Sequence, residues 1–172
     1  MYIPKPGKTN DKIENLRPLS MLESIYKIIT RTLSNRLVST LEHTLSENQH
    51  GFIPKRLTQN CSLPIIEAIN DAQRTGKPLQ ILTIDIKAAF DSISPEHIKE
   101  TMLVQKYPNI FTDTLHNITA EGTGRILTKN YIGTSFHIKS GSGQGDPPSA
   151  LRYNIGADTG LVAVQKVVQR YA

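Results

Sequence analysis

Apolar side chains recur every three or four residues over two stretches in the first half of the chain, which is the spacing of one helical face. The first stretch covers residues 20–45 and opens with a Ser-x-x-Glu capping box, and the second covers 63–72 and ends at the Gly-Lys-Pro of 76–78. Both stretches predict helices. Residues 3–8 precede them as a basic segment that is too rich in proline and glycine to be helical.

The second half of the chain mixes a strand pattern with further helices. Residues 79–86 are nearly all apolar and are bounded by turn residues, which predicts a strand buried on both faces with Asp85 near its carboxyl end. Helices are also predicted for 94–106, for 110–120 and from about Ser149 onwards, and paired strands for 125–128 and 134–138. The pattern therefore predicts a mixed α/β chain.

Composition narrows the class of protein only slightly. With 172 residues and 38% hydrophobic composition, the chain has enough apolar surface for one core. Its formal net charge of +5 suits a polyanionic partner, but many proteins that never bind nucleic acid share such a charge. The basic balance alone does not identify a partner.

Cysteine and histidine usage argues against several other classes. The single cysteine excludes an internal disulfide framework, and we expect Cys61 to be a small buried apolar residue. No histidine pair has metal-ligand spacing, so zinc is not expected. The sequence has no apolar signal core and no stretch long enough to span a membrane, so we expect an intracellular protein, nuclear or cytoplasmic, that is not secreted.

Asp85 is the first candidate for chemistry. Phosphoryl transfer needs metal ions that are held by carboxylates on a rigid element, and a carboxylate at the end of a buried strand is suited to that role. Taken alone, however, such an aspartate more often caps the following turn. The glycine-rich stretch 141–147 also has two interpretations, since it could cradle phosphate or form a plain surface turn.

The order of several short motifs favours the chemical interpretation. The aspartate motif, residues 84–93, reads Ile-Asp-Ile-Lys-Ala-Ala-Phe-Asp-Ser-Ile, and the glycine loop, residues 141–147, reads Gly-Ser-Gly-Gln-Gly-Asp-Pro. Asn-Leu-Arg-Pro-Leu-Ser at 15–20 and Gln-His-Gly-Phe at 49–52 come before them. In this order the motifs resemble the reverse transcriptases of non-LTR (LINE-type) retrotransposons, over about residues 3 to 160.

The resemblance implies a fold and a division of the chain. Reverse transcriptases of this kind have fingers and palm regions, with helices packed on a small, mostly antiparallel sheet. Residues 1–78 correspond to the fingers and 79–172 to part of the palm of one reverse transcriptase domain. The family's second catalytic motif, Tyr-x-Asp-Asp or Phe-x-Asp-Asp, does not occur in these 172 residues.

The resemblance also implies the metal and sugar sites. Asp85 would be the catalytic aspartate and, with the carbonyl of Ile86, would coordinate Mg²⁺, two ions being used in the complete enzyme. Phe90 would be the aromatic steric gate beneath the sugar of the incoming nucleotide. Considered alone, Phe90 reads as an ordinary core phenylalanine.

Four further residues receive roles in nucleotide binding from the resemblance. Gln144 and Gly145 would pack against the incoming base and its template partner. Lys8 and Arg17 would clamp the triphosphate, and for Lys8 a solvated basic loop is the alternative. After the glycine loop the chain departs from the family's usual pattern, because Pro148 and Arg152 stand where other residues are common.

The implied function is RNA-directed DNA polymerisation, with an RNA template, a DNA primer and deoxynucleoside triphosphates as partners. One alternative is a catalytically inactive remnant of a retroelement that only binds nucleic acid. Another is a group II intron maturase or a retron enzyme, which share the palm, although the Asn-x-Arg-Pro-x-Ser and Gln-x-Gly-Phe motifs favour the LINE-type assignment. The sequence leaves the oligomeric state open.

Overall fold

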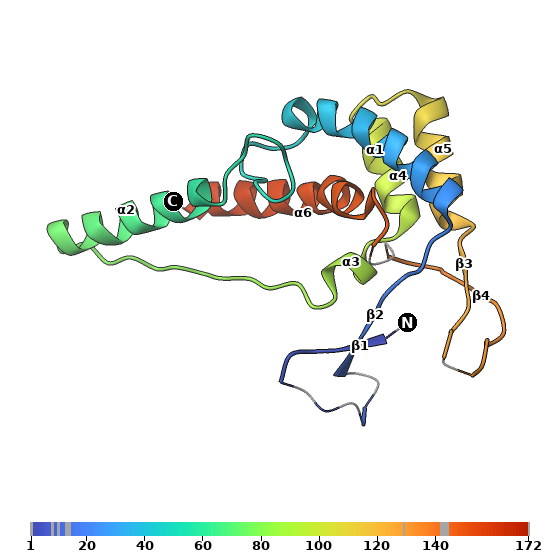
Figure 1. Ribbon diagram of the computed structural model, residues 1–172. Helices are drawn as coiled ribbons and strands as arrows, with labels where there is room; N and C mark the ends of the chain where they lie inside the picture. Colours follow the sequence, from blue (N-terminus) through green and yellow to red (C-terminus); the bar gives the residue numbers. More distant parts are fainter. Residues whose placement is uncertain are drawn as a thin grey trace.

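The computed structural model describes residues 2–7, 9, 11–12, 15–128, 130–141 and 145–171. Lys8 and Gln144, two of the expected site residues, lie outside this part of the chain. Within it, helices labelled α1 to α6 combine with two small antiparallel sheets (Figure 1). The expected α/β class, with a small antiparallel sheet component, is confirmed.

The elements follow one another in the order β1, β2, α1 to α5, β3, β4 and α6. The helices are α1 Ser24–Thr44, α2 Gln59–Thr75, α3 Ala89–Ser92, α4 Pro95–Val104, α5 Asn109–Ala120 and α6 Ser149–Tyr171. The strands are β1 Tyr2–Pro4, β2 Leu16–Pro18, β3 Thr123–Gly124 and β4 Phe136–His137. Strand β1 pairs with β2, and β3 pairs with β4 in a hairpin that the Leu127–Ile132 bridge continues.

The hydrophobic core lies among four helices. Figure 1 shows α1, α4 and α5 gathered around the N-terminal part of α6, and α4 packs against both α5 and α6. The most deeply buried apolar side chains come from all four helices and are Leu37, Leu41, Met102, Leu115 and Ile155. Their burial fixes the position of α6, which carries the glycine loop at its N-terminal end.

Gly156 explains how a helix with two glycines can still pack well. A Cβ on Gly156 would come within 2.8 Å of the Ile93 side chain, so the glycine permits the segment after α3 to lie directly on α6. A glycine inside a helix costs about 1 kcal/mol relative to alanine, but an alanine here would clash with the Ile93 side chain. Of the helices in the described residues, none is both long and apolar enough to cross a membrane.

Local capping signals were correct at one helix and wrong at another. The Ser94 hydroxyl accepts a hydrogen bond from the His97 amide at 3.1 Å, as the Ser-Pro-Glu start of α4 predicts. The capping box expected at residues 20–23 does not form, because α1 begins only at Ser24 and its N-cap Glu23 makes no side-chain cap bond. Residues 19–23 instead continue from β2 without helical structure.

The expected buried strand at 79–86 is wrong. All of these residues are exposed, with Leu82 at 84% and Ile84 at 64%, and the described chain places no strand beside them. A strand depends on a neighbour that accepts its backbone hydrogen bonds, so an apolar run without that neighbour stays unpaired. Helix α2 has no buried residues either, and Cys61 within it is exposed rather than buried as expected.

Candidate active site

The chain makes a tight turn immediately after Asp85 and Ile86. Ala88 adopts a left-handed conformation with φ 52° and forms the N-cap of the one-turn helix α3. Its carbonyl accepts a hydrogen bond from the Asp91 amide at 2.8 Å. A left-handed alanine costs about 1–2 kcal/mol, and the turn persists because neighbouring segments hold it.

The glycine loop is one of those segments. The Gly141 amide donates to the Ile93 carbonyl at 3.1 Å, which ties the start of the loop to the end of the aspartate motif. A Cβ on Gly141 would lie 2.7 Å from the Asp91 Cα and 3.0 Å from the Phe90 carbonyl oxygen. Two motifs that are far apart in the sequence are therefore in backbone contact, and only glycine permits it.

The other end of the glycine loop reaches the N-terminal half of the chain. Gly145 has φ 103°, and a Cβ on it would lie 3.6 Å from the Ser20 carbonyl oxygen. The next residue, Asp146, accepts a hydrogen bond from the Tyr26 hydroxyl of α1 at 3.2 Å. Gly141 thus lies against α3, and Gly145 lies against the connection from β2 to α1.

Asp146, Tyr26 and Arg152 form a buried electrostatic cluster. Burial raises the pKa of Asp146, while the Tyr26 hydrogen bond and the charge of Arg152 oppose that shift. Burial and the negative charge of Asp146 raise the pKa of Tyr26 to about 12. Arg152 is only 2% exposed, and burial lowers its pKa against the effect of Asp146. Arg152, one of the two residues that depart from the usual family pattern, is therefore a buried cation near the glycine loop.

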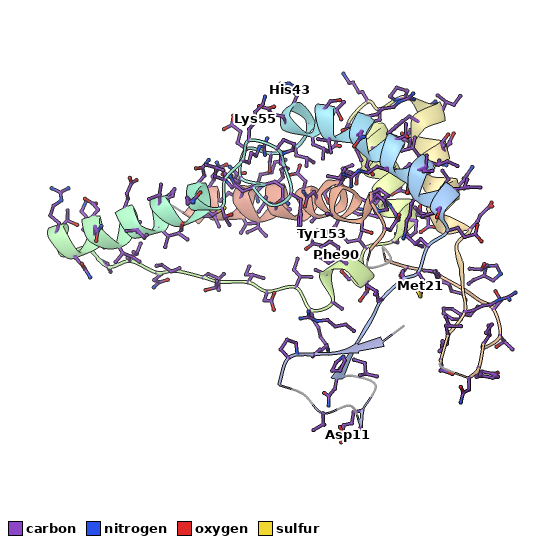
Figure 2. All side chains as sticks on the ribbon, viewed as in Figure 1. Asp11, Met21, His43, Lys55, Phe90 and Tyr153 are labelled. Carbon is purple, nitrogen blue, oxygen red and sulfur yellow. The ribbon has the colours of Figure 1, made fainter. Side chains whose placement is uncertain are left out.

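Phe90 lies between two other aromatic rings. Its ring is half-buried and lies 4.9 Å from the ring of Tyr153, with the two planes inclined at 42°. Figure 2 shows these two side chains next to each other, one from α3 and one from α6. The edge of Phe52, from the loop between α1 and α2, approaches the Phe90 ring with a centroid distance of 6.4 Å. We had not assigned Phe52 or Tyr153 to the site, although Phe52 belongs to the Gln-x-Gly-Phe motif.

Asp85 and Ile86 are both exposed residues just ahead of the α3 turn. Protein-bound Mg²⁺ is usually held by one or two carboxylates together with substrate phosphates. These two residues fit one part of such a site. The described residues contain no group of three or more His, Cys, Asp or Glu side chains that could hold a metal by itself.

A cavity of about 450 Å³ opens beside Ile86, between the aspartate motif and α6. His97 lines it and is held in place, since its Nε2 lies 3.1 Å from the Gly156 carbonyl and 3.2 Å from the Thr159 hydroxyl. The remaining lining residues are Ser92, Ile93, Ser94, Tyr153, Gly156, Ala157, Thr159 and Gly160. His97 is thus bonded to α6.

Arg17 is exposed in β2, where it lies opposite Ile3 in the hairpin. The chain then runs from Arg17 to Ser20, whose carbonyl lies next to Gly145. The short segment from Arg17 to Ser20 thus links strand β2 to the contact with Gly145. The structure brings together the aspartate motif, the glycine loop and the start of α1, and it places Arg17 just ahead of that junction.

Comparison with known proteins identifies the family. Residues 3–172 match the family model described as reverse transcriptase (RNA-dependent DNA polymerase), and the chain belongs to this family. The resemblance to non-LTR retrotransposon reverse transcriptases is likewise confirmed by the relatives that the chain matches. Polymerases of this family generally use divalent metal ions and act with a nucleic-acid template and primer and deoxynucleotides.

Three relatives illustrate the similarity. The chain is 26% identical, over 95% of its length, to the Transposon TX1 uncharacterized 149 kDa protein of Xenopus laevis. It is 28% identical, over 92% of its length, to the Pol polyprotein from the type-2 retrotransposable element R2DM of Drosophila melanogaster. It is 30% identical, over 94% of its length, to that from the type-1 element R2 of Nasonia vitripennis. The chain spans only 12%, 15% and 15% of these relatives, respectively.

Proposed function

We propose that this chain forms the nucleotide-binding part of an RNA-directed DNA polymerase from a LINE-like retroelement. The reaction is the addition of deoxynucleotides to a primer 3′-hydroxyl, copied from an RNA template. The observation that carries the proposal is the backbone contact of Gly141 with Phe90 and Asp91, because it joins the aspartate motif to the glycine loop. Both motifs would then face one nucleotide.

The metal-binding role falls to Asp85 and the Ile86 carbonyl. Bound Mg²⁺ would lower the basicity of the attacking hydroxyl and neutralise charge on the phosphates. The Asp85 carboxylate supplies an anionic oxygen ligand, and the adjoining carbonyl supplies a neutral one. The exposure of both residues supports this role, since a ligand carboxylate must be reachable by substrate phosphates.

Sugar and base selection fall to the aromatic ring and the glycine loop. A bulky ring at Phe90 beneath the sugar would leave no room for a 2′-hydroxyl and would select deoxynucleotides. Gln144 and Gly145 would contact the base pair, and the glycine at φ 103° lets the backbone approach closely. Lys8 and Arg17 would bind the triphosphate. In this assignment residues 1–78 act as fingers and 79–172 as part of a palm.

The 172 residues alone should not polymerise. After Asp146 the only acidic side chain is Asp158, and it is 6% exposed and accepts hydrogen bonds from the Ser46 amide and hydroxyl. Asp158 is therefore engaged in the fold and is not a second metal ligand beside Asp85. Two ions about 4 Å apart need more carboxylate oxygens than Asp85 supplies.

The test is primer extension on a primed RNA template with Mg²⁺ and deoxynucleotides. One sample is a polypeptide in which a Tyr- or Phe-x-Asp-Asp segment follows residue 172, and we expect Asp85-dependent extension from it. Asp85→Asn should abolish that activity and leave folding intact, because it removes metal-binding charge rather than packing. The matched control is Asp113→Asn, a half-buried carboxylate on α5 that is 2.8 Å from Lys99.

Activity retained in Asp85→Asn would refute the proposal, as would equal losses in the two variants. Asp85-dependent extension by the 172 residues alone would show that a second carboxylate had been overlooked. A second candidate function is nucleic-acid binding without catalysis, which is favoured by the lack, among the described residues, of a group of three or more His, Cys, Asp or Glu side chains that could hold a metal ion. Salt-dependent duplex binding without any extension by the continued polypeptide would support that candidate.

A further inference from the structure

The ring of Phe90 has contacts on two sides, and neither contact belongs to its own helix. Tyr153 of α6 lies 4.9 Å away and Phe52 of the loop after α1 lies 6.4 Å away, at an interplanar angle of 73°. Aromatic pairs with centroids 4.5–7 Å apart and an edge-to-face geometry are favourable. The α3 turn is a single helical turn that cannot fix a side chain by itself, so these two rings determine where Phe90 lies.

Phe52 is an unusual residue for its position. It is 65% exposed and has φ 58°, a left-handed conformation that a bulky side chain rarely adopts. An exposed ring gains little from burial, and the backbone conformation costs about 1–3 kcal/mol. Core packing therefore does not account for Phe52, whereas its edge contact with Phe90 gives the ring a role.

The side chain of Asn154 holds the Phe52 backbone in place. Asn154 is 1% exposed, and its Nδ2 donates to the Gly51 carbonyl at 2.5 Å. Its Oδ1 accepts a hydrogen bond from the Gln49 side chain at 2.8 Å. The peptide immediately before Phe52 is thus bonded to α6 through a buried amide, and a buried hydrogen bond of this kind is costly to lose.

The rest of the loop is bound at its base. Asp158 lies one helical turn beyond Asn154 on α6, and its carboxylate accepts from the Ser46 amide at 3.1 Å and from the Ser46 hydroxyl at 2.6 Å. The Arg56 guanidinium donates to carbonyls of the turn, among them Gln49 at 2.7 Å. The loop from 46 to 56 is therefore attached to α6 at two points and closed on itself by Arg56.

We propose that Phe52 and Tyr153 are positioning residues that hold the Phe90 ring against the sugar of the incoming nucleotide, and that Asn154 fixes Phe52 for this purpose. The proposal rests on the sugar-selecting role given to Phe90 above. Two adjacent residues of α6 position the Phe90 ring: Tyr153 contacts the ring directly, and Asn154 acts through the loop that carries Phe52. A displaced Phe90 ring would admit a 2′-hydroxyl without any change in Phe90 itself.

The first test uses the 172-residue chain and needs no activity. The sequence contains only four phenylalanines, so ring-labelled phenylalanine gives few NMR signals. We expect a ring-to-ring nuclear Overhauser effect between Phe52 and Phe90, and its loss in Asn154→Ala. The Tyr107–Phe111 pair, with centroids 6.4 Å apart elsewhere in the core, reports in the same sample that the protein is folded.

The outcomes of this test are separable. Absence of the Phe52–Phe90 effect in the unsubstituted chain overturns the proposal, and so does its persistence in Asn154→Ala. If Asn154→Ala also loses the Tyr107–Phe111 effect, the milder Gln49→Ala decides, because it removes a single bond to Asn154. Loss of the Phe52–Phe90 effect in folded Gln49→Ala supports the proposal, and its persistence overturns it.

The second test measures kcat/KM for deoxynucleotides against ribonucleotides in the continued polypeptide. Phe52→Leu and Tyr153→Leu should each lower the deoxynucleotide preference by about three- to tenfold, the value of one aromatic contact. Tyr153→Phe keeps the ring and should retain the preference. Phe111→Leu, the matched control, loses an aromatic contact of 6.4 Å in the core and should leave the preference unchanged.

Failure of this inference differs from failure of the proposed function. If the unsubstituted polypeptide shows no Asp85-dependent extension, the polymerase assignment fails and the sugar-selecting purpose fails with it. If Phe90→Val lowers the preference while Phe52→Leu and Tyr153→Leu match Phe111→Leu, only the positioning roles are overturned. If Phe90→Val itself leaves the preference unchanged, Phe90 is not the gate, and neighbours that hold it have no effect on selection.

Discussion

Gly141 lies so close to Asp91 that a Cβ on the glycine would come within 2.7 Å of the Asp91 Cα. It also has φ 82°, so both its conformation and its surroundings exclude a side chain. Gly76, the C-cap of α2, shares the left-handed conformation at φ 67° but has open space around it. Substituting each glycine by alanine therefore separates the free-energy cost of the left-handed backbone from that of the close contact with Asp91.

The first prediction concerns this contact. Gly76→Ala should cost about 1–2 kcal/mol of unfolding free energy, the strain of a left-handed alanine. Gly141→Ala should cost about 1–3 kcal/mol more, because the backbone of Asp91 cannot move aside as a flexible side chain would. Urea unfolding of the two variants measures the difference. Equal losses of unfolding free energy in the two variants would show that the backbone at Gly141 is not in close contact with the aspartate motif.

The second prediction concerns the hydrogen bond between Tyr26 and Asp146. Removing it in Tyr26→Phe should cost about 1–2 kcal/mol at pH 7. Burial raises the pKa of Asp146 in the folded state above the unfolded pKa of 3.8. The protonated carboxyl therefore stabilises the fold at pH values below 3.8, and this stabilisation is lost as the pH rises through the folded-state pKa. Without Tyr26 the pKa of Asp146 rises further, and that loss grows.

The destabilisation by Tyr26→Phe should therefore shrink as the pH falls towards 4. Urea midpoints at the two pH values measure it. The matched control is Tyr107→Phe, since the Tyr107 hydroxyl lies 2.8 Å and 3.0 Å from the neutral hydroxyls of Thr40 and Thr44. Its cost should not change with pH, and a Tyr26→Phe cost equally independent of pH would contradict a charged partner at Asp146.

The third prediction concerns Arg17 and nucleic acid. Binding of the chain to an RNA–DNA duplex should weaken steeply with salt, because basic side chains that contact phosphate release counterions. Arg17→Gln should reduce the magnitude of the slope of log K against log salt by about 1, the value of one phosphate contact. Lys55→Gln makes the same change in charge and should leave the slope unchanged. Lys55 is already paired with Glu42 at 3.0 Å. Identical slopes for the two variants would argue against a phosphate contact at Arg17.

The fourth prediction concerns the exposed apolar segment at 79–86. Its unpaired backbone and apolar side chains make the 172-residue chain prone to self-association. Leu82 is 84% exposed, so Leu82→Lys should reduce light scattering of the purified chain without lowering its unfolding free energy. The control Lys77→Arg keeps the charge just outside the segment and should scatter as the unsubstituted chain does. Unchanged scattering in Leu82→Lys would show that another surface drives association.

Local signals in the sequence were sufficient for the start of α4, for the end of α2 and for the order of the motifs. The Ser-Pro start of α4 and the glycine end of α2 are decided by bonds and dihedral angles within a few residues, and both are found where the sequence predicts them. The family's motifs likewise indicate Asp85 and Phe90 as candidate site residues without any structure, because a motif preserves the order of residue types.

Tertiary structure decided everything that depends on a distant partner. An apolar run becomes a strand only beside another strand, so 79–86 remains unpaired despite its pattern. The capping box at 20–23 gives way to an extended segment whose Ser20 carbonyl lies next to Gly145. The contact of Phe52 with Phe90 depends on Asn154, a buried amide on a helix remote in sequence. No local pattern encodes such contacts, because their energy comes from groups that only the folded chain brings together.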